Sequence, residues 1–188
     1  WFTSEYKDYQ YISGKVVTAA HQKQKQLFSI LRMKALMSYT SKEDYALSLA
    51  KSIDKKCIIF ANTKKQADKM CSHSYHSGNP QSEENLELFK DGRVQTLSSV
   101  LQLNEGVSIP NLELGIVMHA YGNERKTAQR IGRLLRLNPD KVATCHILCY
   151  ENTIDEKWVK NALKSFDQSK IKTIHINGKN QRSLFEDA

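Results

Sequence analysis

No apolar run in this sequence approaches the roughly 20 residues that a membrane-spanning helix needs. The first residues, Trp1 to Glu5, also lack the basic segment followed by an apolar one that marks a secretory leader. Low-complexity tracts and internal repeats are absent, and the composition, 40% hydrophobic and 26% charged, is ordinary for a globular domain. We therefore predict a folded protein without a membrane partner.

The length of the chain limits how many domains it holds. Its 188 residues are enough for one well-buried domain with an appendage, but hardly for two full domains. Because the chain begins with Trp1 rather than Met, we interpret it as a piece of a longer protein.

Cysteines are few, and their spacing fits no common zinc pattern. Cys57, Cys145 and Cys149 lie in apolar, strand-like runs, where a reduced cysteine behaves as a small hydrophobe. Cys71 has His76 nearby, but no second cysteine pair accompanies them, so we expect no metal site. This usage predicts a reducing compartment, such as the cytoplasm of a bacterium or of a virus-infected cell.

Positive charge exceeds negative charge, with 28 Lys and Arg against 20 Asp and Glu and a formal net charge of +8. The lysines are spread along the chain rather than gathered in one block, which predicts a basic surface rather than a disordered tail. Such a surface favours polyanionic partners through counterion release.

The first 55 residues differ in pattern from the rest. Residues 1–20 mix aromatic and polar side chains with little helical period, so we expect an extended lead-in, a strand or an interdomain linker. Residues 21–55 have the apolar spacing of helices, and Ser41 with Asp44 resembles a capping box that starts a second helix. We therefore predict an N-terminal helical segment.

After Lys56 short apolar runs alternate with helical patterns. The predicted strands are residues 57–60, 94–100, 114–120, 142–149 and 171–176. Thr63 with Gln66 is predicted to cap the first helix between them, and Gly92 is predicted to close the second. Repeated β-α units of this length predict an α/β fold, a parallel sheet with helices on both faces, over residues 56–176. Residues 177–188 are predicted to be a mobile tail.

Three polar loops follow the predicted strands, at residues 61–63, 103–108 and 122–123. Asn, Gly and Ser form turns, so each loop alone is explained as a turn. In an open parallel sheet, however, ligands bind beyond the carboxyl ends of the strands, where these loops are expected to meet. Together they predict a site at one edge of the sheet.

A row of basic residues occupies the segment from Gln129 to Arg136. If this segment is helical, Gln129, Arg133 and Arg136 fall at i, i+4 and i+7 and share one face. Gly132 leaves the neighbouring surface free of bulk. Fixed guanidinium groups suit the spread charge of a phosphoryl group in transit, whereas the alternative is a solvated basic face.

The order and spacing of four segments resemble the second RecA-like motor domain of superfamily 2 helicases. They are residues 57–68 for motif IV, 75–78 with 89–92 for the stretch that follows, 95–110 for motif V and 129–136 for motif VI. The resemblance covers about half of the chain, from Lys56 to Glu151, and four matches in register are specific. It implies a RecA-like parallel sheet sandwiched by helices.

The resemblance implies a role for each matched residue. Arg136 is expected to be an arginine finger that reaches the γ-phosphate of ATP, with Arg133 as a second phosphate contact and Gln129 in the same row. Gly106 and Ser108 are expected to meet the nucleotide or to couple it to the nucleic acid.

Nucleic-acid contacts are implied for residues of motifs IV and V. Thr63, together with Asn62, is expected to hold a strand phosphate, which is recognition of the backbone rather than of bases. Ser99 is expected to make a similar contact from motif V. Ser108 stands where the family often has Asp, and the hydroxyl-bearing position of motif V usually lies nearer to Gly106 than Ser99 does.

The sequence lacks a Gly-x-x-x-x-Gly-Lys-Thr/Ser loop and an Asp-Glu pair directly after a strand. In the family both belong to the first motor domain, which mainly holds ATP and Mg²⁺. We therefore expect an N-terminal RecA-like domain, in the same or another chain, as a partner, and we predict that this chain alone hydrolyses no ATP.

Motif VI begins with Gln129 rather than His, which resembles the DNA-repair, recombination and bacteriophage branch, so we favour DNA over RNA. An alternative is a non-catalytic RecA-like module that binds nucleic acid or a partner. The coding sequence upstream of Trp1 discriminates between them, because only the motor requires the phosphate loop. A third alternative, an unrelated nucleotide-binding α/β protein, is disfavoured because no Gly-rich loop joins a strand to a helix.

Overall fold

The computed structural model describes residues 1–100, 108–120, 125, 128, 131–132 and 143–176. The chain divides into two compact units, Trp1–Asp44 and Tyr45–Ala188. Each unit is described by itself. Within the described residues, no helix combines the length and the hydropathy that crossing a bilayer requires.

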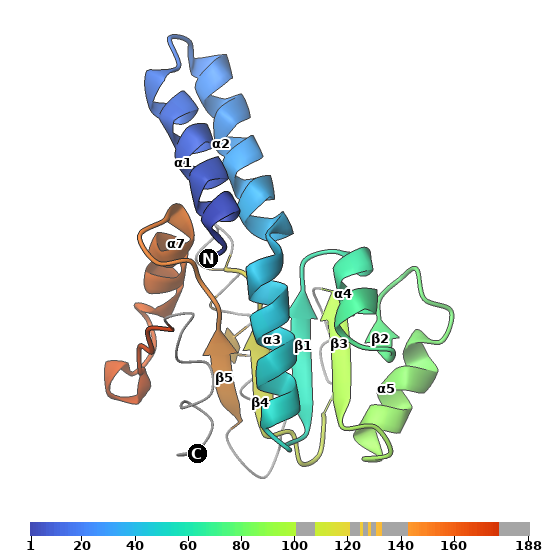
Figure 1. Ribbon diagram of the computed structural model, residues 1–188. Helices are drawn as coiled ribbons and strands as arrows, with labels where there is room; N and C mark the ends of the chain where they lie inside the picture. The colour runs from blue at the N-terminus through green and yellow to red at the C-terminus, as the bar shows by residue number, and fades with distance from the viewer. Residues whose placement is uncertain (101–107, 121–124, 126–127, 129–130, 133–142, 177–188) are drawn as a thin grey trace. The chain divides into compact units, whose positions relative to one another are not determined.

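The first unit is a helical hairpin (Figure 1). Helix α1 (Thr3–Thr18) packs against α2 (Gln22–Ser38), and α3 (Thr40–Ser52) begins at the end of this unit. The expectation of an extended segment over residues 1–20 was therefore wrong. Its buried positions, Glu5, Tyr9 and Val16, do have helical spacing, but the carboxylate at the first of them hides the pattern.

Glu5 explains a second difference. Its carboxylate accepts hydrogen bonds from the Phe2 amide at 3.1 Å, the Ser41 amide at 3.0 Å and the Ser41 hydroxyl. Burial alone would raise the pKa of Glu5, but these bonds outweigh it and hold the pKa below its usual value. Ser41 is the second residue of α3 rather than its N-cap, so the capping box predicted from Ser41 and Asp44 was wrong. A carboxylate from α1 serves the first turn of α3 instead.

The second unit contains a five-stranded sheet in which every pairing is parallel, as predicted. Its strands are β1 (Cys57–Ala61), β2 (Ser74–Tyr75), β3 (Thr96–Val100), β4 (Leu114–Val117) and β5 (Thr144–Ile147), in the order β2-β3-β1-β4-β5. The helices are α4 (Lys64–Met70), α5 (Ser82–Lys90) and α7 (Ile154–Leu163), followed by the 3₁₀ turn η1 (Gln168–Lys170).

Helices cover both faces of this sheet. Side chains alternate along β1, so successive residues pack against helices on opposite faces. Ile58 and Phe60 belong to a buried cluster that includes Leu86 and Phe89 of α5. Cys57 and Ile59 belong to the opposite cluster, with Ala46 and Leu49 of α3 and Met70 of α4. The predicted α/β sandwich, preceded by a helical segment, is confirmed.

Two predictions of local structure have different outcomes. Gly92 ends α5 in the left-handed region, at a φ of 76°, as predicted. The strand predicted over residues 171–176 is absent, and that segment has no regular structure. Ile174 and Ile176 are 56% and 38% exposed, and no neighbouring strand pairs with them in the described chain. A strand without a partner leaves its backbone groups unpaired, so apolar alternation alone did not suffice.

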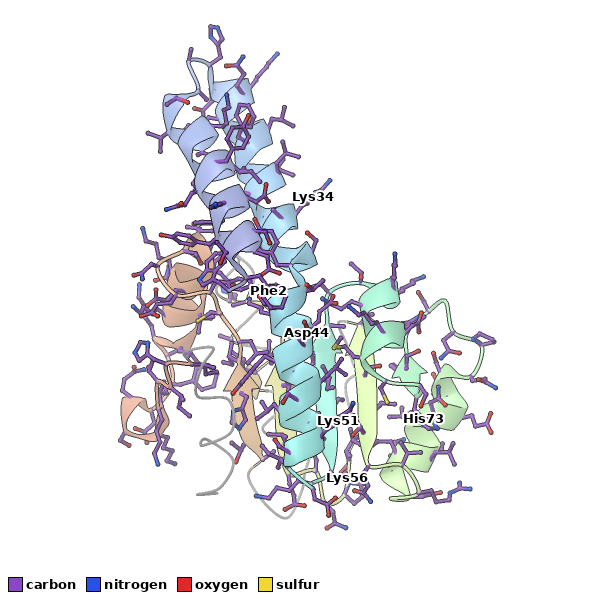
Figure 2. The ribbon with its side chains drawn as sticks, viewed as in Figure 1. Phe2, Lys34, Asp44, Lys51, Lys56 and His73 are labelled. Carbon is purple, nitrogen blue, oxygen red and sulfur yellow. The ribbon has the colours of Figure 1, made fainter. Side chains whose placement is uncertain are left out.

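The buried side chain of Lys56 connects the amino-terminal end of β1 to the end of α5. The Lys56 ammonium donates to the carbonyl of Lys90 at 3.0 Å and to that of Pro110 at 2.7 Å. It also lies 5.1 Å from the centre of the Phe89 ring. Burial lowers the pKa of Lys56, and nearby Asp91 opposes this shift. Lys56 lies where the chain passes from α3 into β1 (Figure 2).

Candidate functional site

The carboxyl ends of the central strands lie side by side. In the parallel register Ala61 of β1 pairs with Val100 of β3, and Phe60 pairs with Val117 of β4. The chain leaves β3 on one side of β1 and returns as β4 on the other, which is the topological switch point where open α/β sheets bind ligands. The loop after β1 therefore lies at the centre of the predicted site.

This loop has a specific local structure. Thr63 is the N-cap of α4, and its hydroxyl oxygen accepts from the Gln66 amide at 3.1 Å, as predicted. The Gln66 side chain accepts in turn from the Asn62 amide at 2.9 Å. Asn62 is half-buried and Thr63 is exposed. The loop is thus held from both ends while the Thr63 hydroxyl keeps its proton available as a donor.

Two exposed lysines follow directly. Lys64 and Lys65 occupy the first turn of α4, beside the Thr63 hydroxyl. From the sequence, both lysines are assigned to the basic surface and to the motif IV segment, residues 57–68, without a role of their own. Their place beside a hydroxyl donor at the switch point makes them candidate phosphate contacts, and their adjacency to Thr63 in the motif was the signal that would have found them.

Ser99 differs from these residues in exposure. It lies in β3, is 0% exposed, and its hydroxyl oxygen has no hydrogen-bond partner among the described residues. A direct phosphate contact requires an accessible hydroxyl, so the burial of Ser99 weighs against that assignment, which stays a prediction.

Ser108 is exposed, and the chain that follows it runs along the amino edge of the sheet. Two residues later, the Pro110 carbonyl accepts from Lys56, which precedes β1. The nucleotide role of Ser108 stays a prediction.

The arginine row falls on positions that the structure does not describe. Gln129, Arg133 and Arg136, and likewise Gly106, lie outside the described residues. Within the segment from Gln129 to Arg136, residues 131–132 are described and are helical, as are residues 125 and 128 before it, which agrees with the helix considered for this segment. Ile131 is buried at 2% exposure, and a Cβ at Gly132 would meet no atom of the described residues within 4 Å.

A polar cluster after β2 is a second candidate for chemistry. The Ser74 hydroxyl donates to Asp68 at 2.6 Å, and Nε2 of His76 donates to the same carboxylate oxygen at 2.8 Å. Nδ1 of His76 accepts from the Gly78 amide at 3.2 Å. Hydrogen bonds from Ser74 and His76 hold the pKa of Asp68 below its usual value.

This cluster is not a nucleophilic triad. The histidine of a triad uses one ring nitrogen toward the nucleophile and the other toward the carboxylate. Here Nε2 of His76 faces both Ser74 and Asp68, while Nδ1 is taken by a backbone amide. His76 therefore orders the loop after β2. No three His, Cys, Asp or Glu side chains converge as metal ligands in the described part of the chain.

The parallel sheet, its switch point and the polar loop after β1 are features of a RecA-like α/β domain. Residues 41–138, just over half of the chain, match the family of helicase conserved C-terminal domains. The chain belongs to this family, and it is a C-terminal RecA-like domain of the superfamily 2 helicases.

One curated relative is the DNA 3'-5' translocase XPB2 of Sulfurisphaera tokodaii, which is 35% identical over 82 residues. The match covers 44% of this chain and 18% of that protein, so the chain spans less than a fifth of its relative's length.

Solved structures agree with the fold. The C-terminal domain of the DEAD-box protein Dbp5 superposes with a TM-score of 0.61 at 16% identity, over 79% of this chain and 89% of that one. The E. coli DEAD-box protein SrmB, bound to regulator of ribonuclease activity A, gives a TM-score of 0.53 at 16% identity, over 67% of this chain and 79% of that one. At these identities the likeness concerns the fold alone.

Proposed function

We propose that this chain is the C-terminal motor domain of an ATP-dependent superfamily 2 DNA helicase or translocase. The observation that carries the proposal is the register of β3, β1 and β4. It brings the loop of Asn62 and Thr63 beside the carboxyl end of β3, a strand within the segment that matches motif V, and beside the carboxyl end of β4. The XPB2 relative is a DNA translocase, which supports DNA over RNA. Placement in the DNA-repair, recombination and bacteriophage branch remains part of the proposal.

The nucleotide side of the site belongs to the arginine row. In the proposed arrangement Arg136 and Arg133 contact the phosphates of ATP, with Gln129, Gly106 and Ser108 beside them. Guanidinium groups fit phosphate oxygens, because they carry fixed positive charge and paired N–H donors. ATP and Mg²⁺ would be held mainly by an N-terminal RecA-like partner domain, where the metal would supply positive charge to the phosphates.

The nucleic-acid side of the site belongs to the loop after β1. Thr63 donates its hydroxyl to a strand phosphate, and half-buried Asn62, from the same loop, is the second proposed contact. Lys64 and Lys65 lie next to them and are exposed, which suits a backbone contact without base recognition. Ser99 is the weakest member of the proposed set because it is buried.

The role of Thr63 is testable without losing the cap of α4. Thr63→Asp keeps an N-cap acceptor but places a negative charge against the phosphate. In the intact protein we expect this change to weaken binding of single-stranded DNA at least about tenfold, since a hydrogen bond to a charged group contributes about 1.5–3 kcal/mol. Fluorescence anisotropy at fixed salt measures the dissociation constant.

Thr63→Ser is the matched control, because it keeps both the cap and the hydroxyl. It is expected to bind DNA as the unaltered protein does, and both variants are expected to melt at similar temperatures. Equal DNA affinity for Thr63→Asp and Thr63→Ser contradicts the phosphate contact.

The ATPase activity of the isolated chain tests the proposal that ATP hydrolysis requires a first motor domain in addition to this one. We expect no ATP turnover by residues 1–188 alone, with or without DNA, because the phosphate loop is not in this sequence and its Asp-Glu pair, Asp155-Glu156, lies in the first turn of α7 rather than directly after a strand. Phosphate release measured over hours is the assay, and adding the first motor domain is expected to restore turnover. Robust DNA-stimulated hydrolysis by the isolated chain contradicts the proposal.

A further inference from the structure

The hairpin of α1 and α2 carries an unusual charge pattern. Between Tyr9 and Ser38 the sequence contains five Lys and Arg residues and no Asp or Glu. Surface helices of soluble proteins ordinarily mix both signs of charge. The charged side chains of this part of the hairpin are therefore all basic, which favours an acidic partner.

The same part of the hairpin exposes large apolar side chains. Tyr11 of α1 is 67% exposed, and Leu27, Ile30 and Leu31 of α2 are 54%, 47% and 42% exposed. One exposed apolar side chain needs no explanation, but several on two adjacent helices mark an interaction surface.

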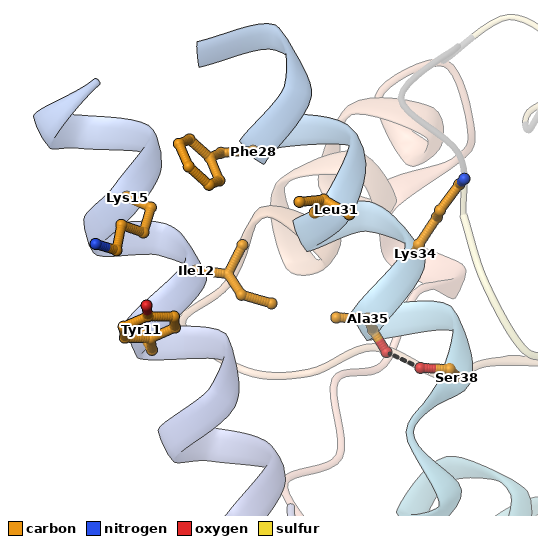
Figure 3. A pocket seen from close by; sticks show the side chains of 8 residues that line it. All are labelled: Tyr11, Ile12, Lys15, Phe28, Leu31, Lys34, Ala35 and Ser38. Carbon is orange, nitrogen blue, oxygen red and sulfur yellow. Dashed lines mark hydrogen bonds between the residues drawn. The ribbon is translucent and has the colours of Figure 1, made fainter. Parts of the chain in front are cut away.

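A groove between α1 and α2 brings the two properties together (Figure 3). Its apolar lining comes from Tyr11, Ile12, Phe28, Leu31 and Ala35. Ile12, Phe28 and Leu31 point into the space between the two helices in Figure 3. Phe28, Leu31 and Ala35 are spaced i, i+3 and i+7, so they line one face of α2.

Positive charge borders this groove on both helices. Lys15 of α1 and Lys34 of α2 are lining residues, and both are exposed. In Figure 3 their ammonium groups point away from the groove, outward from the two helices. The Lys15 ammonium lies 5.3 Å from the centre of the Tyr11 ring, which holds that charge at the edge of the groove.

We propose that this groove binds an amphipathic helix of a partner protein, with acidic residues on either side of its apolar stripe. A third helix laid along two antiparallel helices buries its apolar side chains against Ile12, Phe28 and Leu31. Its flanking carboxylates then face Lys15 and Lys34. The electrostatic match selects the acidic helix and its orientation.

The lining favours a protein helix over a nucleic acid. Ile12, Leu31 and Ala35 are aliphatic and offer no hydrogen bond to sugar or phosphate groups, and the Ser38 hydroxyl already donates to the Ala35 carbonyl at 2.9 Å. The apolar side chains of a helix lower their free energy when they leave water for such an apolar lining, whereas phosphates do not. This inference is independent of the proposed motor function, because it uses only residues of the first unit.

A pair of designed peptides tests the proposal on the full 188-residue chain. Each peptide is a helix with leucines at i, i+3, i+4 and i+7, flanked in one peptide by glutamates and in the other by lysines. We expect the glutamate peptide to bind at least tenfold more tightly than the lysine peptide, by fluorescence anisotropy at low salt. Equal affinity for the two peptides overturns the proposal.

Variants of the chain locate the binding surface. Leu31→Asp is expected to weaken binding of the glutamate peptide at least tenfold, because it places a charge in the groove. The double variant K15E/K34E is expected to reverse the preference, so that the lysine peptide becomes the tighter ligand. Circular dichroism is expected to show unchanged helix content for both.

Matched controls lie on the same hairpin outside the groove. Val17→Asp changes a side chain that is 82% exposed, and Lys23→Glu reverses a charge near the turn between the helices, and both are expected to leave peptide binding unchanged. Losses equal to those of the groove variants overturn the proposal. A second contrary outcome is that the chain binds neither peptide but does bind a single-stranded oligonucleotide, and that K15E/K34E abolishes this binding. That result identifies a nucleic-acid surface and overturns the proposal. A third contrary outcome is that the chain binds neither peptide but self-associates, and that Leu31→Asp abolishes the self-association. That result identifies a second copy of the chain as the occupant of the groove and overturns the proposal.

Discussion

Arg136→Ala in the intact protein is expected to lower ATP turnover about 10³-fold, because an arginine finger stabilises charge that develops only in the transition state. Nucleotide affinity is expected to change much less, since ground-state binding depends mainly on the phosphate loop of the first motor domain. Steady-state phosphate release and the binding of a fluorescent nucleotide measure the two quantities separately.

Arg125→Ala is the matched control for this experiment. Arg125 is helical and exposed, and it lies outside the proposed row of phosphate contacts. Its replacement removes the same charge from the same segment and is expected to change turnover little. Unchanged turnover in Arg136→Ala, or equal losses in both variants, contradicts the assignment of Arg136 as the finger.

Phe89→Ala is expected to lower the free energy of unfolding by about 3–5 kcal/mol. Phe89 is 0% exposed, belongs to the cluster that joins α5 to β1, and lies under the Lys56 ammonium. Its loss opens a cavity in that cluster and removes the ring beneath a buried charge. Denaturant unfolding of the 188-residue chain measures the change.

Leu88→Ala is the control, because Leu88 is the half-buried neighbour of Phe89 on α5. It removes a similar kind of side chain from the same turn of the helix and is expected to cost well below half as much. Equal losses at the two positions contradict the placement of Phe89 in the core between α5 and the sheet.

The sheet was predictable because its strands are buried on both faces. A strand such as Cys57–Ala61 then consists of apolar residues in succession, and polar turns separate it from the next helix. The cap of α4 was predictable for a similar reason, since Thr63 and Gln66 act within one turn of the chain. Local chemistry sufficed in both cases.

The wrong predictions of local structure concern segments whose conformation depends on contacts between residues distant in sequence. A helix over residues 3–18 depends on packing against α2, and the carboxylate of Glu5 is useful only because Ser41 lies beside it. The absence of a strand after η1 depends on whether another strand is available to pair with it. None of these conditions can be derived from a window of a few residues.

For the candidate site, too, the sequence indicated which residues to consider, and the structure showed which of them are accessible. Motif order pointed to Asn62, Thr63 and Ser99 alike, because all three follow or end apolar runs. The structure separates them, since Thr63 is exposed at the end of β1 while Ser99 is fully enclosed in β3. Exposure is decided by what packs over a side chain, and sequence spacing does not record it.

The sequence by itself determined the α/β architecture, the helicase motifs and their order, because burial, turns and caps leave local patterns. Tertiary structure alone decided that the first residues form a helical hairpin with a basic-edged apolar groove. It also decided that Asp68, Ser74 and His76 form a structural cluster and that Lys56 links α5 to the sheet. The physical reason is that these features arise where distant segments meet, and the free energy of such contacts depends on positions in space rather than on order along the chain.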